Sequence, residues 1–184
     1  MNKLIGVLAV QGDFGAHLEA LIAVGAKYRE IRNSHDLQGV THLIIPGGES
    51  TTIRRVTTIN GLWEKLESFT GPVMGTCMGS ILMAERILSP DDRGWGMLDM
   101  TIRRNAYGRQ INSFTGRGKV AFLNHDFDMV FIRAPKIIEL GRAVKPIAWF
   151  GNEITGVISG NKMALTFHPE LSESTKLHEY FLEL

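Results

Sequence analysis

Short apolar runs alternate with longer mixed stretches over the first half of the chain. The runs at 4–10, 27–32, 41–46 and 71–76 have the length and composition of buried strands. The stretches at 13–25, 52–69 and 78–88 are predicted as helices; in the first, Asp13 is placed to cap the helix and Gly25 to end it. Strands that alternate with helices predict an α/β fold, with a doubly wound, mostly parallel sheet and flanking helices.

From Trp95 onward the pattern changes to short β-like runs joined by turns of Gly, Pro, Asn and Asp. These runs occupy 97–104, 118–123, 128–134, 136–140, 143–150, 153–160 and 162–167, and a last helix is predicted within 172–184. The sequence has no internal repeat, low-complexity linker or block of like charge. Residues 1–184 are therefore predicted to form a single domain.

Composition narrows the classes of partner. The 184 residues are 44% hydrophobic and 21% charged, with a net charge of +1, so we expect neither a nucleic-acid nor a membrane partner. The opening run Leu4–Val10 has the length of a short signal-peptide core, but polar residues follow it, and a buried strand is the better interpretation. A lone cysteine excludes an internal disulfide and suits a reducing, cytoplasmic compartment.

That cysteine, Cys77, lies in the sequence Gly75-Thr76-Cys77-Met78-Gly79 between a predicted strand and a predicted helix. The spacing is that of a nucleophile elbow with Cys in the place of Ser. The turn would lift the sulfur above the sheet edge, and the Met78 N–H would point toward an oxyanion. A small core hydrophobe is the alternative interpretation of a lone cysteine.

A thiol nucleophile needs a base, and the sequence singles out one of six histidines. His17, His35, His42, His125 and His178 lie in helical, loop or polar settings and are interpreted as solvated or structural. His168 ends an apolar strand and is followed by Pro169 and Glu170. In extended chain, residues two apart project to the same side, so Glu170 can orient the imidazole of His168 as the third member of a triad.

The segment 46–52, Pro-Gly-Gly-Glu-Ser-Thr-Thr, follows the third predicted strand and is expected beside the elbow. Gly47 and Gly48 can turn backbone N–H groups inward and supply the second oxyanion donor. The segment is too short for a phosphate-binding loop and lacks its lysine. The alternative is a plain turn before a helix capped by Ser50 or Thr51.

Taken together, the motifs resemble the glutaminase subunits of pyridoxal 5′-phosphate synthase, which are class I, triad-type glutamine amidotransferases. In chain order they are AVQGDFGAH, LIIPGGESTTIRR, GTCMGS, RRNAYGRQ, FIRAP and FHPEL, and they span most of the sequence. The elbow and His-Pro-Glu are shared by many class I amidotransferases. PGGEST, RNAYGRQ and FIRAP are typical of this subfamily.

The resemblance implies a flavodoxin-like fold, hydrolysis of L-glutamine to glutamate and ammonia, and a synthase (lyase) subunit as partner in a hetero-oligomer. It implies no cofactor and no metal. By this likeness Cys77, His168 and Glu170 form the triad, and Gln11 lies near the oxyanion loop. The residues implied to line the glutamine site are Gly48, Glu49, Ser50, Arg104, Ile132 and Arg133. Of these, an arginine would clamp the α-carboxylate and Glu49 would meet the α-ammonium.

Two alternatives stay open at this point. One is the glutaminase of imidazole glycerol phosphate synthase, against which FIRAP speaks. The other is a non-enzymatic elbow-thiol sensor, which would need no oriented His–Glu pair. The chain also departs from many relatives, with Met78 and Ser80 where Ala and Leu are common, and its segment 118–129 is unlike the expected pattern.

Overall fold

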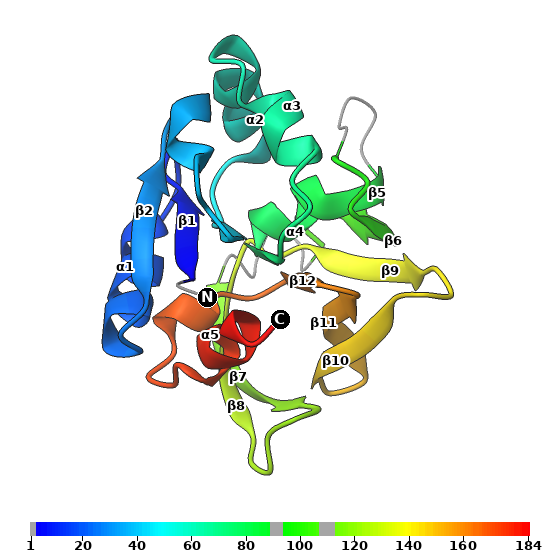
Figure 1. The fold of residues 1–184 in the computed structure, drawn as a ribbon. Helices are drawn as coiled ribbons and strands as arrows, with labels where there is room; N and C mark the ends of the chain where they lie inside the picture. Colours follow the sequence, from blue (N-terminus) through cyan, green and yellow to red (C-terminus); the bar gives the residue numbers. More distant parts are fainter. Residues whose placement is uncertain (1–2, 89–93, 107–112) are drawn as a thin grey trace.

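A computed structural model describes residues 3–88, 94–106 and 113–184 of the chain. Its centre is a large mixed sheet of nine strands within these ranges (Figure 1). The strands follow in the spatial order β2 (Lys27–Ile31), β1 (Leu4–Leu8), β3 (His42–Ile45), β4 (Val73–Thr76), β12 (Lys162–Leu165), β11 (Glu153–Ser159), β10 (Lys145–Phe150), β7 (Ser113–Val120) and β8 (Phe127–Ile132). Neighbours from β2 to β12 pair in parallel, and those from β12 to β8 pair antiparallel.

Helices cover both faces of the parallel half. They are α1 (Phe14–Ala23), α2 (Ser50–Ile59), α3 (Trp63–Glu67), α4 (Met78–Met83) and α5 (Lys176–Leu182), with short 3₁₀ turns η1 (Ser34–Leu37) and η2 (Pro169–Leu171). Within β3, Ile44 packs in one apolar cluster with Leu21 of α1 and Phe181 of α5. Its neighbour Ile45 packs in the other cluster with Ile53 of α2. The predicted α/β fold with a two-sided sheet is confirmed.

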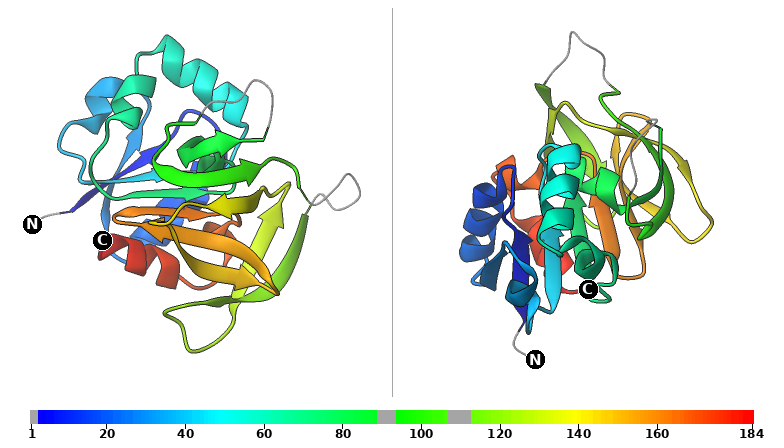
Figure 2. Two further views of the ribbon diagram at one scale, coloured as in Figure 1. Left: turned by 90° about the vertical axis from the view of Figure 1, so that its right-hand side faces the viewer. Right: turned by 90° about the horizontal axis from the view of Figure 1, so that it is seen from above.

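A second, three-stranded sheet lies beside the large one (Figures 1 and 2). Its order is β5 (Ala84–Ile87), β6 (Leu98–Arg103) and β9 (Lys136–Leu140). The predicted helix over 78–88 is wrong beyond Met83, because Ala84–Ile87 pairs in parallel with β6. Carbonyl groups at the end of α4 accept hydrogen bonds from residues outside the helix. The Trp95 N–H donates to the Leu82 carbonyl, and the Gly96 N–H donates to the Ala84 carbonyl. Those partners from outside the helix end it five residues earlier than local composition suggests.

The predicted helix over 52–69 is two helices, α2 and α3. The break falls at Asn60 and Gly61, where Gly61 has a φ of +68° that a helix cannot continue through. The strand predicted over 118–123 is found as β7, which ends earlier, at Val120, and pairs with β8 from Ser113 onward.

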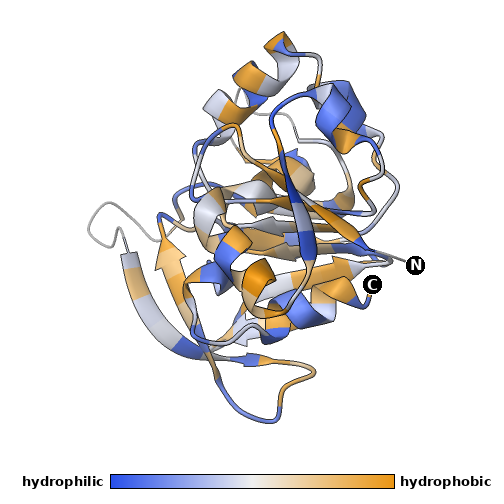
Figure 3. Cartoon of the chain, turned by 60° about the vertical axis from the view of Figure 1, so that its left-hand side comes forward, coloured by the Kyte–Doolittle hydropathy of each residue, from blue (hydrophilic) through white to orange (hydrophobic). Residues whose placement is uncertain are grey.

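Hydropathy follows this layering. The strands in the middle of the molecule carry mostly apolar residues, and the helices carry both kinds (Figure 3). Among the described residues, no helix is long and apolar enough to cross a membrane.

Candidate active site

The lone cysteine lies at a strained turn between β4 and α4. Cys77 has φ +48° and ψ −112°, a conformation that residues other than glycine rarely adopt. A Cβ atom on Gly79 would overlap the Ile45 carbonyl, and one on Gly75 would lie 2.5 Å from the Met83 sulfur. The elbow predicted from the sequence is therefore present, and its two glycines are required by the crowding around it.

His168 follows β12 and leads into η2, which carries Glu170. Nδ1 of His168 lies 2.7 Å from Oε1 of Glu170. The carboxylate only accepts hydrogen bonds, so the ring donates through Nδ1. Nε2 of His168 is buried and has no hydrogen-bond partner among the described residues, so it is free to act on a nearby thiol. The backbone N–H of His168 donates to the Val130 carbonyl of β8, 2.8 Å away. The central sheet therefore fixes the backbone position from which the imidazole extends.

The imidazole of His168 is held in its charged form. Burial by itself lowers the pKa of His168, but the adjacent Cys77 and Glu170 side chains, the second of them hydrogen-bonded to Nδ1, raise that pKa to about 10. His168 and Glu170 are 6% and 8% exposed, so water screens this interaction only weakly. A charged imidazole beside a cysteine is the arrangement that thiol nucleophiles use.

The glycine segment 47–48 closes over the same point. A Cβ on Gly47 would lie 2.6 Å from Cε1 of His168 and 3.3 Å from Cβ of Cys77, so only glycine fits there. Gly48 has φ +150°. Behind it, Oε1 of Gln11 accepts a hydrogen bond of 2.6 Å from the backbone N–H of Glu49. Gln11 thus lies against the segment predicted to form the oxyanion hole.

Opposite charges meet next to this segment. Nη2 of Arg104 donates to Oε1 of Glu49 at 2.8 Å. Hydrogen bonds from Thr51 and Arg104 hold the pKa of Glu49 below its usual range. Glu49, rather than Ser50 or Thr51, is the N-cap of α2, because its carboxylate accepts from the Thr51 N–H. One cation and one anion at the mouth of the site suit an amino acid that carries both charges.

The remaining predicted residues differ in their surroundings. The carbonyl oxygen of Ile132, at the end of β8, accepts from Sγ of Cys77 at 3.4 Å, and Arg133 follows with φ +46° and an exposed side chain. The Ser50 side chain is buried, 2% exposed, and Met78 is 7% exposed. The residues Tyr107–Gln110 of the RNAYGRQ motif lie outside the described ranges.

Comparison with known proteins decides the family. The model of the SNO glutamine amidotransferase family matches residues 7–184. The chain belongs to this family. Among its curated relatives, the pyridoxal 5′-phosphate synthase subunit PdxT of Thermococcus gammatolerans is 44% identical, with 97% of this chain and 96% of that protein covered. The subunit of the same name from Deinococcus radiodurans is 45% identical, with 98% and 96% covered.

Solved structures support the fold of this SNO family member. A crystal structure of a glutamine amidotransferase superposes with a TM-score of 0.91 at 41% identity, over 97% of both chains. The structure of PurLQS from Thermotoga maritima superposes with a TM-score of 0.71 at 16% identity, which is a likeness of fold alone. The class I glutamine amidotransferase fold expected from the sequence motifs is thereby confirmed.

Ser80, one of the departures noted in the sequence, takes part in the elbow. Its hydroxyl donates to the Cys77 carbonyl oxygen at 2.5 Å, and its backbone N–H donates to the same atom at 3.1 Å. The hydroxyl is fully buried. Ser80 therefore fixes the peptide that carries the nucleophile, a role that Leu could not fill.

Two histidines that the sequence did not single out lie behind the predicted triad, where His17 contacts Glu170 and His178 contacts His17. His17 of α1 and His178 of α5 are both fully buried. Nε2 of His17 lies 3.3 Å from Oε2 of Glu170. The signal was present in the helical pattern, since His17 lies one turn before buried Leu21 and His178 three residues before buried Phe181. Histidine at a core-facing helix position needs a polar partner, which the pattern alone does not identify.

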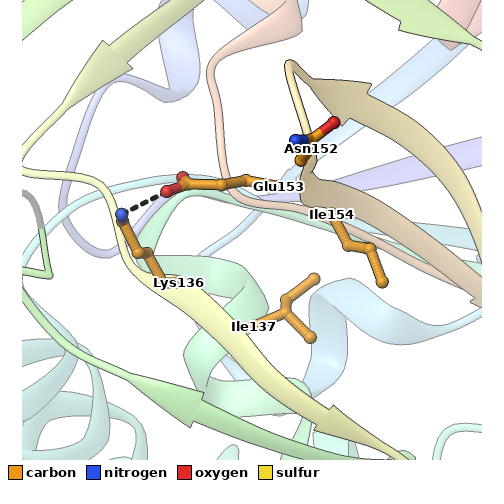
Figure 4. A pocket seen from close by; sticks show the side chains of 5 residues that line it. All are labelled: Lys136, Ile137, Asn152, Glu153 and Ile154. Atoms are coloured by element: carbon orange, nitrogen blue, oxygen red, sulfur yellow. Dashed lines mark hydrogen bonds and ion pairs between the residues drawn. The ribbon is translucent and has the colours of Figure 1, made fainter.

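A cavity of about 300 Å³ lies between β9 and the β10–β11 turn, and none of its lining residues belongs to the candidate site (Figure 4). Its lining consists of Lys136, Ile137, Asn152, Glu153 and Ile154. Nζ of Lys136 lies 2.5 Å from Oε1 of Glu153, an ion pair that joins the small sheet to the large one. The two charged side chains that line this cavity therefore pair with each other and link the two sheets. Among the described residues, no group of three or more His, Cys, Asp or Glu side chains could hold a metal ion.

Proposed function

We propose that this chain is the glutaminase subunit of a pyridoxal 5′-phosphate synthase, with Cys77, His168 and Glu170 as its catalytic triad. The observation that carries the proposal is the alignment of a strained elbow cysteine with a buried His168 whose Nδ1 lies 2.7 Å from Glu170. A thiol sensor would need no such oriented pair. The relatives at 44% and 45% identity are pyridoxal 5′-phosphate synthase subunits, which supports an assignment to pyridoxal 5′-phosphate synthesis over another amidotransferase.

The reaction begins with the thiolate of Cys77. Sγ attacks the side-chain amide carbon of glutamine, a C–S bond forms, and the amide oxygen becomes an oxyanion. Backbone N–H groups of Met78 and of the segment at Gly47 and Gly48 are proposed to stabilise that charge. When the intermediate collapses, the C–N bond breaks, and the imidazolium of His168 gives its proton to the departing amine, which leaves as ammonia.

The second half of the reaction returns the enzyme to its starting state. Neutral His168 takes a proton from water, and the resulting hydroxide attacks the thioester carbon. The C–S bond breaks, glutamate leaves, and the thiolate of Cys77 is restored beside the imidazolium. Glu170 keeps the ring in its Nδ1–H tautomer through both steps and stabilises the imidazolium without taking the proton.

Recognition of glutamine is assigned to the charged pair at the mouth of the site. Arg104 and Arg133 are the proposed partners of the α-carboxylate, and Glu49 is the proposed partner of the α-ammonium. In the structure Arg104 and Glu49 bond each other at 2.8 Å, so each already holds its position near the other. Bound glutamine would exchange this one contact for two of the same kind. The backbone of Gly48, Ser50 and Ile132 completes the proposed site.

A synthase subunit is the proposed partner, in a hetero-oligomer. Ammonia is mostly protonated in neutral water, and ammonium is no nucleophile, so direct transfer to a second active site preserves its reactivity. Gln11 and Gly12 precede α1 and pack on the oxyanion segment, where Gly12 leaves no room for a Cβ beside the Gly47 carbonyl. A partner bound at α1 could therefore select the competent conformation of Gly47 and Gly48. The free thiol is consistent with the expected cytoplasmic location.

Labelling with a glutamine-like electrophile, such as a diazoketone analogue, tests the assignment of the site. Mass spectrometry should find one adduct per chain, on Cys77, and excess glutamine should suppress it. The Cys77→Ser variant is the control and should take none. Labelling that glutamine does not slow would show that Cys77 does not face a glutamine site.

A further inference from the structure

A buried cluster of polar side chains continues behind Glu170. On the far side of the carboxylate from His168, Oε2 of Glu170 lies 3.3 Å from Nε2 of His17. Nδ1 of His17 lies 3.0 Å from Nε2 of His178. Both histidines are fully buried, and they come from α1 and α5, two helices on the same face of the large sheet.

His17 also contacts the residue next to the predicted nucleophile. Its Nε2 lies 3.1 Å from the hydroxyl oxygen of Thr76, the last residue of β4 and the neighbour of Cys77. One imidazole therefore contacts both the carboxylate of Glu170 and the residue that precedes the nucleophile. Asp13, before α1, adds a more distant negative charge.

The contacts fix where the protons lie. A bare Nε2 on His17 would turn its lone pair toward the carboxylate of Glu170, 3.3 Å away, so Nε2 carries the hydrogen and shares a hydrogen bond with the Thr76 hydroxyl. Nδ1 of neutral His17 is then an acceptor, and Nε2–H of His178 is its donor. This leaves Nδ1 of His178 without a hydrogen. That atom is buried and has no hydrogen-bond partner among the described residues, which an acceptor tolerates better than an N–H donor would.

The electrostatics agree with two neutral rings beside one carboxylate. Burial lowers the pKa of His17, and burial with the neighbouring His17 lowers that of His178 to about 3. Burial would raise the pKa of Glu170, but the Nε2–H that His17 turns toward the carboxylate and the charged, hydrogen-bonded ring of His168 keep that pKa below its usual range. The carboxylate thus stays ionised although it is 8% exposed.

We infer that His17 and His178 are positioning residues for glutamine hydrolysis. His178 orients His17, and His17 holds Oε2 of Glu170 so that Oε1 of the same carboxylate faces Nδ1 of His168. The inference rests on the proposed function for its role in the reaction, and on geometry alone for the proton arrangement. It predicts that the basicity of His168 depends on a residue of α1 that does not contact His168 in the hydrogen-bond network.

The proton arrangement is tested first, in the wild-type chain, by long-range ¹⁵N–¹H NMR of the histidine rings. Both His17 and His178 should appear as neutral Nε2–H tautomers from pH 6 to 8. A charged ring, or an Nδ1–H tautomer at either residue, would overturn the inference. This measurement is made on the wild-type chain without substrate, so it does not depend on whether any variant folds.

The coupling to the triad is tested with His17→Leu, which removes the donor, and His17→Gln, which restores an amide N–H near the position of Nε2. The rate of Cys77 alkylation by iodoacetamide is followed against pH. In His17→Leu the profile should move to higher pH by about half a unit or more, because a less basic His168 supports the thiolate less well. His17→Gln should recover most of the shift. The control His42→Leu alters another buried histidine, 5% exposed and bonded to Thr41, and should leave the profile unchanged.

Steady-state kinetics with the synthase subunit adds the functional readout. His17→Leu should lower kcat for glutamine by roughly tenfold to a hundredfold, the range known for partners that orient catalytic ligands, with KM nearly unchanged. An unshifted alkylation profile in folded His17→Leu would overturn the inference even if the enzyme is a glutaminase. A shifted profile in a chain that hydrolyses no glutamine would uphold the proton network and refute the proposed function instead.

Discussion

Oε1 of Glu170 lies 2.7 Å from Nδ1 of His168, and a single residue, Pro169, separates the two along the chain. The proline starts η2, so the turn that follows the strand brings the carboxylate to Nδ1 of the ring. Contact of this kind sets the tautomer of the imidazole and favours its charged form.

The two residues should differ in their effect on turnover. His168→Ala removes the group that moves the proton and is expected to lower kcat by roughly 10⁴-fold or more, whereas Glu170→Ala removes only orientation and charge and should cost less. Steady-state glutamate production by both variants, with the synthase subunit present, gives the comparison. Equal losses, or a greater loss in Glu170→Ala, would mean that the roles are misassigned.

Removal of the arginine side chains should weaken the binding of glutamine more than it slows the chemistry. Loss of a charged hydrogen bond costs about 1.5–3 kcal/mol, so Arg104→Gln or Arg133→Gln should raise KM for glutamine by roughly tenfold to a hundredfold. The exposed neighbour Arg103→Gln is the matched control and should leave KM unchanged. Identical saturation curves for both test variants and the wild type would place the α-carboxylate elsewhere.

Crowding at the elbow predicts a large effect on stability. A Cβ on Gly79 would overlap the Ile45 carbonyl, so Gly79→Ala should lower the free energy of unfolding by about 1–3 kcal/mol or more. In Gly15→Ala, within α1, the nearest atom would lie 3.9 Å from the new Cβ, and helix propensity should raise stability by up to about 1 kcal/mol. Urea unfolding measures both, and a Gly79→Ala chain as stable as wild type would contradict the geometry.

The buried histidines predict a loss of stability in acid. Because the pKa of His178 is lowered to about 3 in the folded chain, only the unfolded chain binds its proton as pH falls below about 6.5. Each such histidine lowers the free energy of unfolding by up to about 1.4 kcal/mol per pH unit. His168 acts in the opposite sense: its raised pKa gives stability that is complete below pH 6.5 and is lost as pH rises through about 10.

Urea unfolding between pH 6.5 and 5 isolates the contribution of His178. The slope against pH should be shallower in His178→Gln than in the wild type. Exposed His35→Gln should keep the wild-type slope. If the His178→Gln and wild-type slopes coincide, His178 titrates alike in the folded and unfolded chains.

Local pattern predicted most of the strands but not the ends of the helices. Runs such as His42–Ile45 are buried on both sides, so their apolar composition alone predicts a strand. Ala84–Ile87 does not, because its strand depends on pairing with Leu98–Arg103 and its preceding helix ends on bonds from Trp95 and Gly96. The antiparallel half of the sheet is built mostly from hairpins between consecutive strands, so the sheet is mixed where alternation in the first half of the chain suggested mostly parallel strands.

Part of the candidate site is likewise predictable from local sequence, and part of it depends on the fold. Cys77, His168 and Glu170 are found from short motifs, because the elbow and the His-Pro-Glu turn are local in sequence. The contacts of His17 with Glu170 and of Ser80 with the Cys77 carbonyl are not found, since a buried histidine or serine has many possible partners. Arg104 and Glu49 are 55 residues apart, and only the fold brings them to 2.8 Å.

Glutamate release from glutamine, measured for the wild type and for Cys77→Ser with and without the synthase subunit, tests the central claim most directly. The wild type should produce glutamate, and more of it when the synthase subunit is added. Cys77→Ser, with an unchanged circular dichroism spectrum, should produce none above background in either case. Release near the wild-type rate from the folded serine variant would contradict the assignment of Cys77 as the nucleophile.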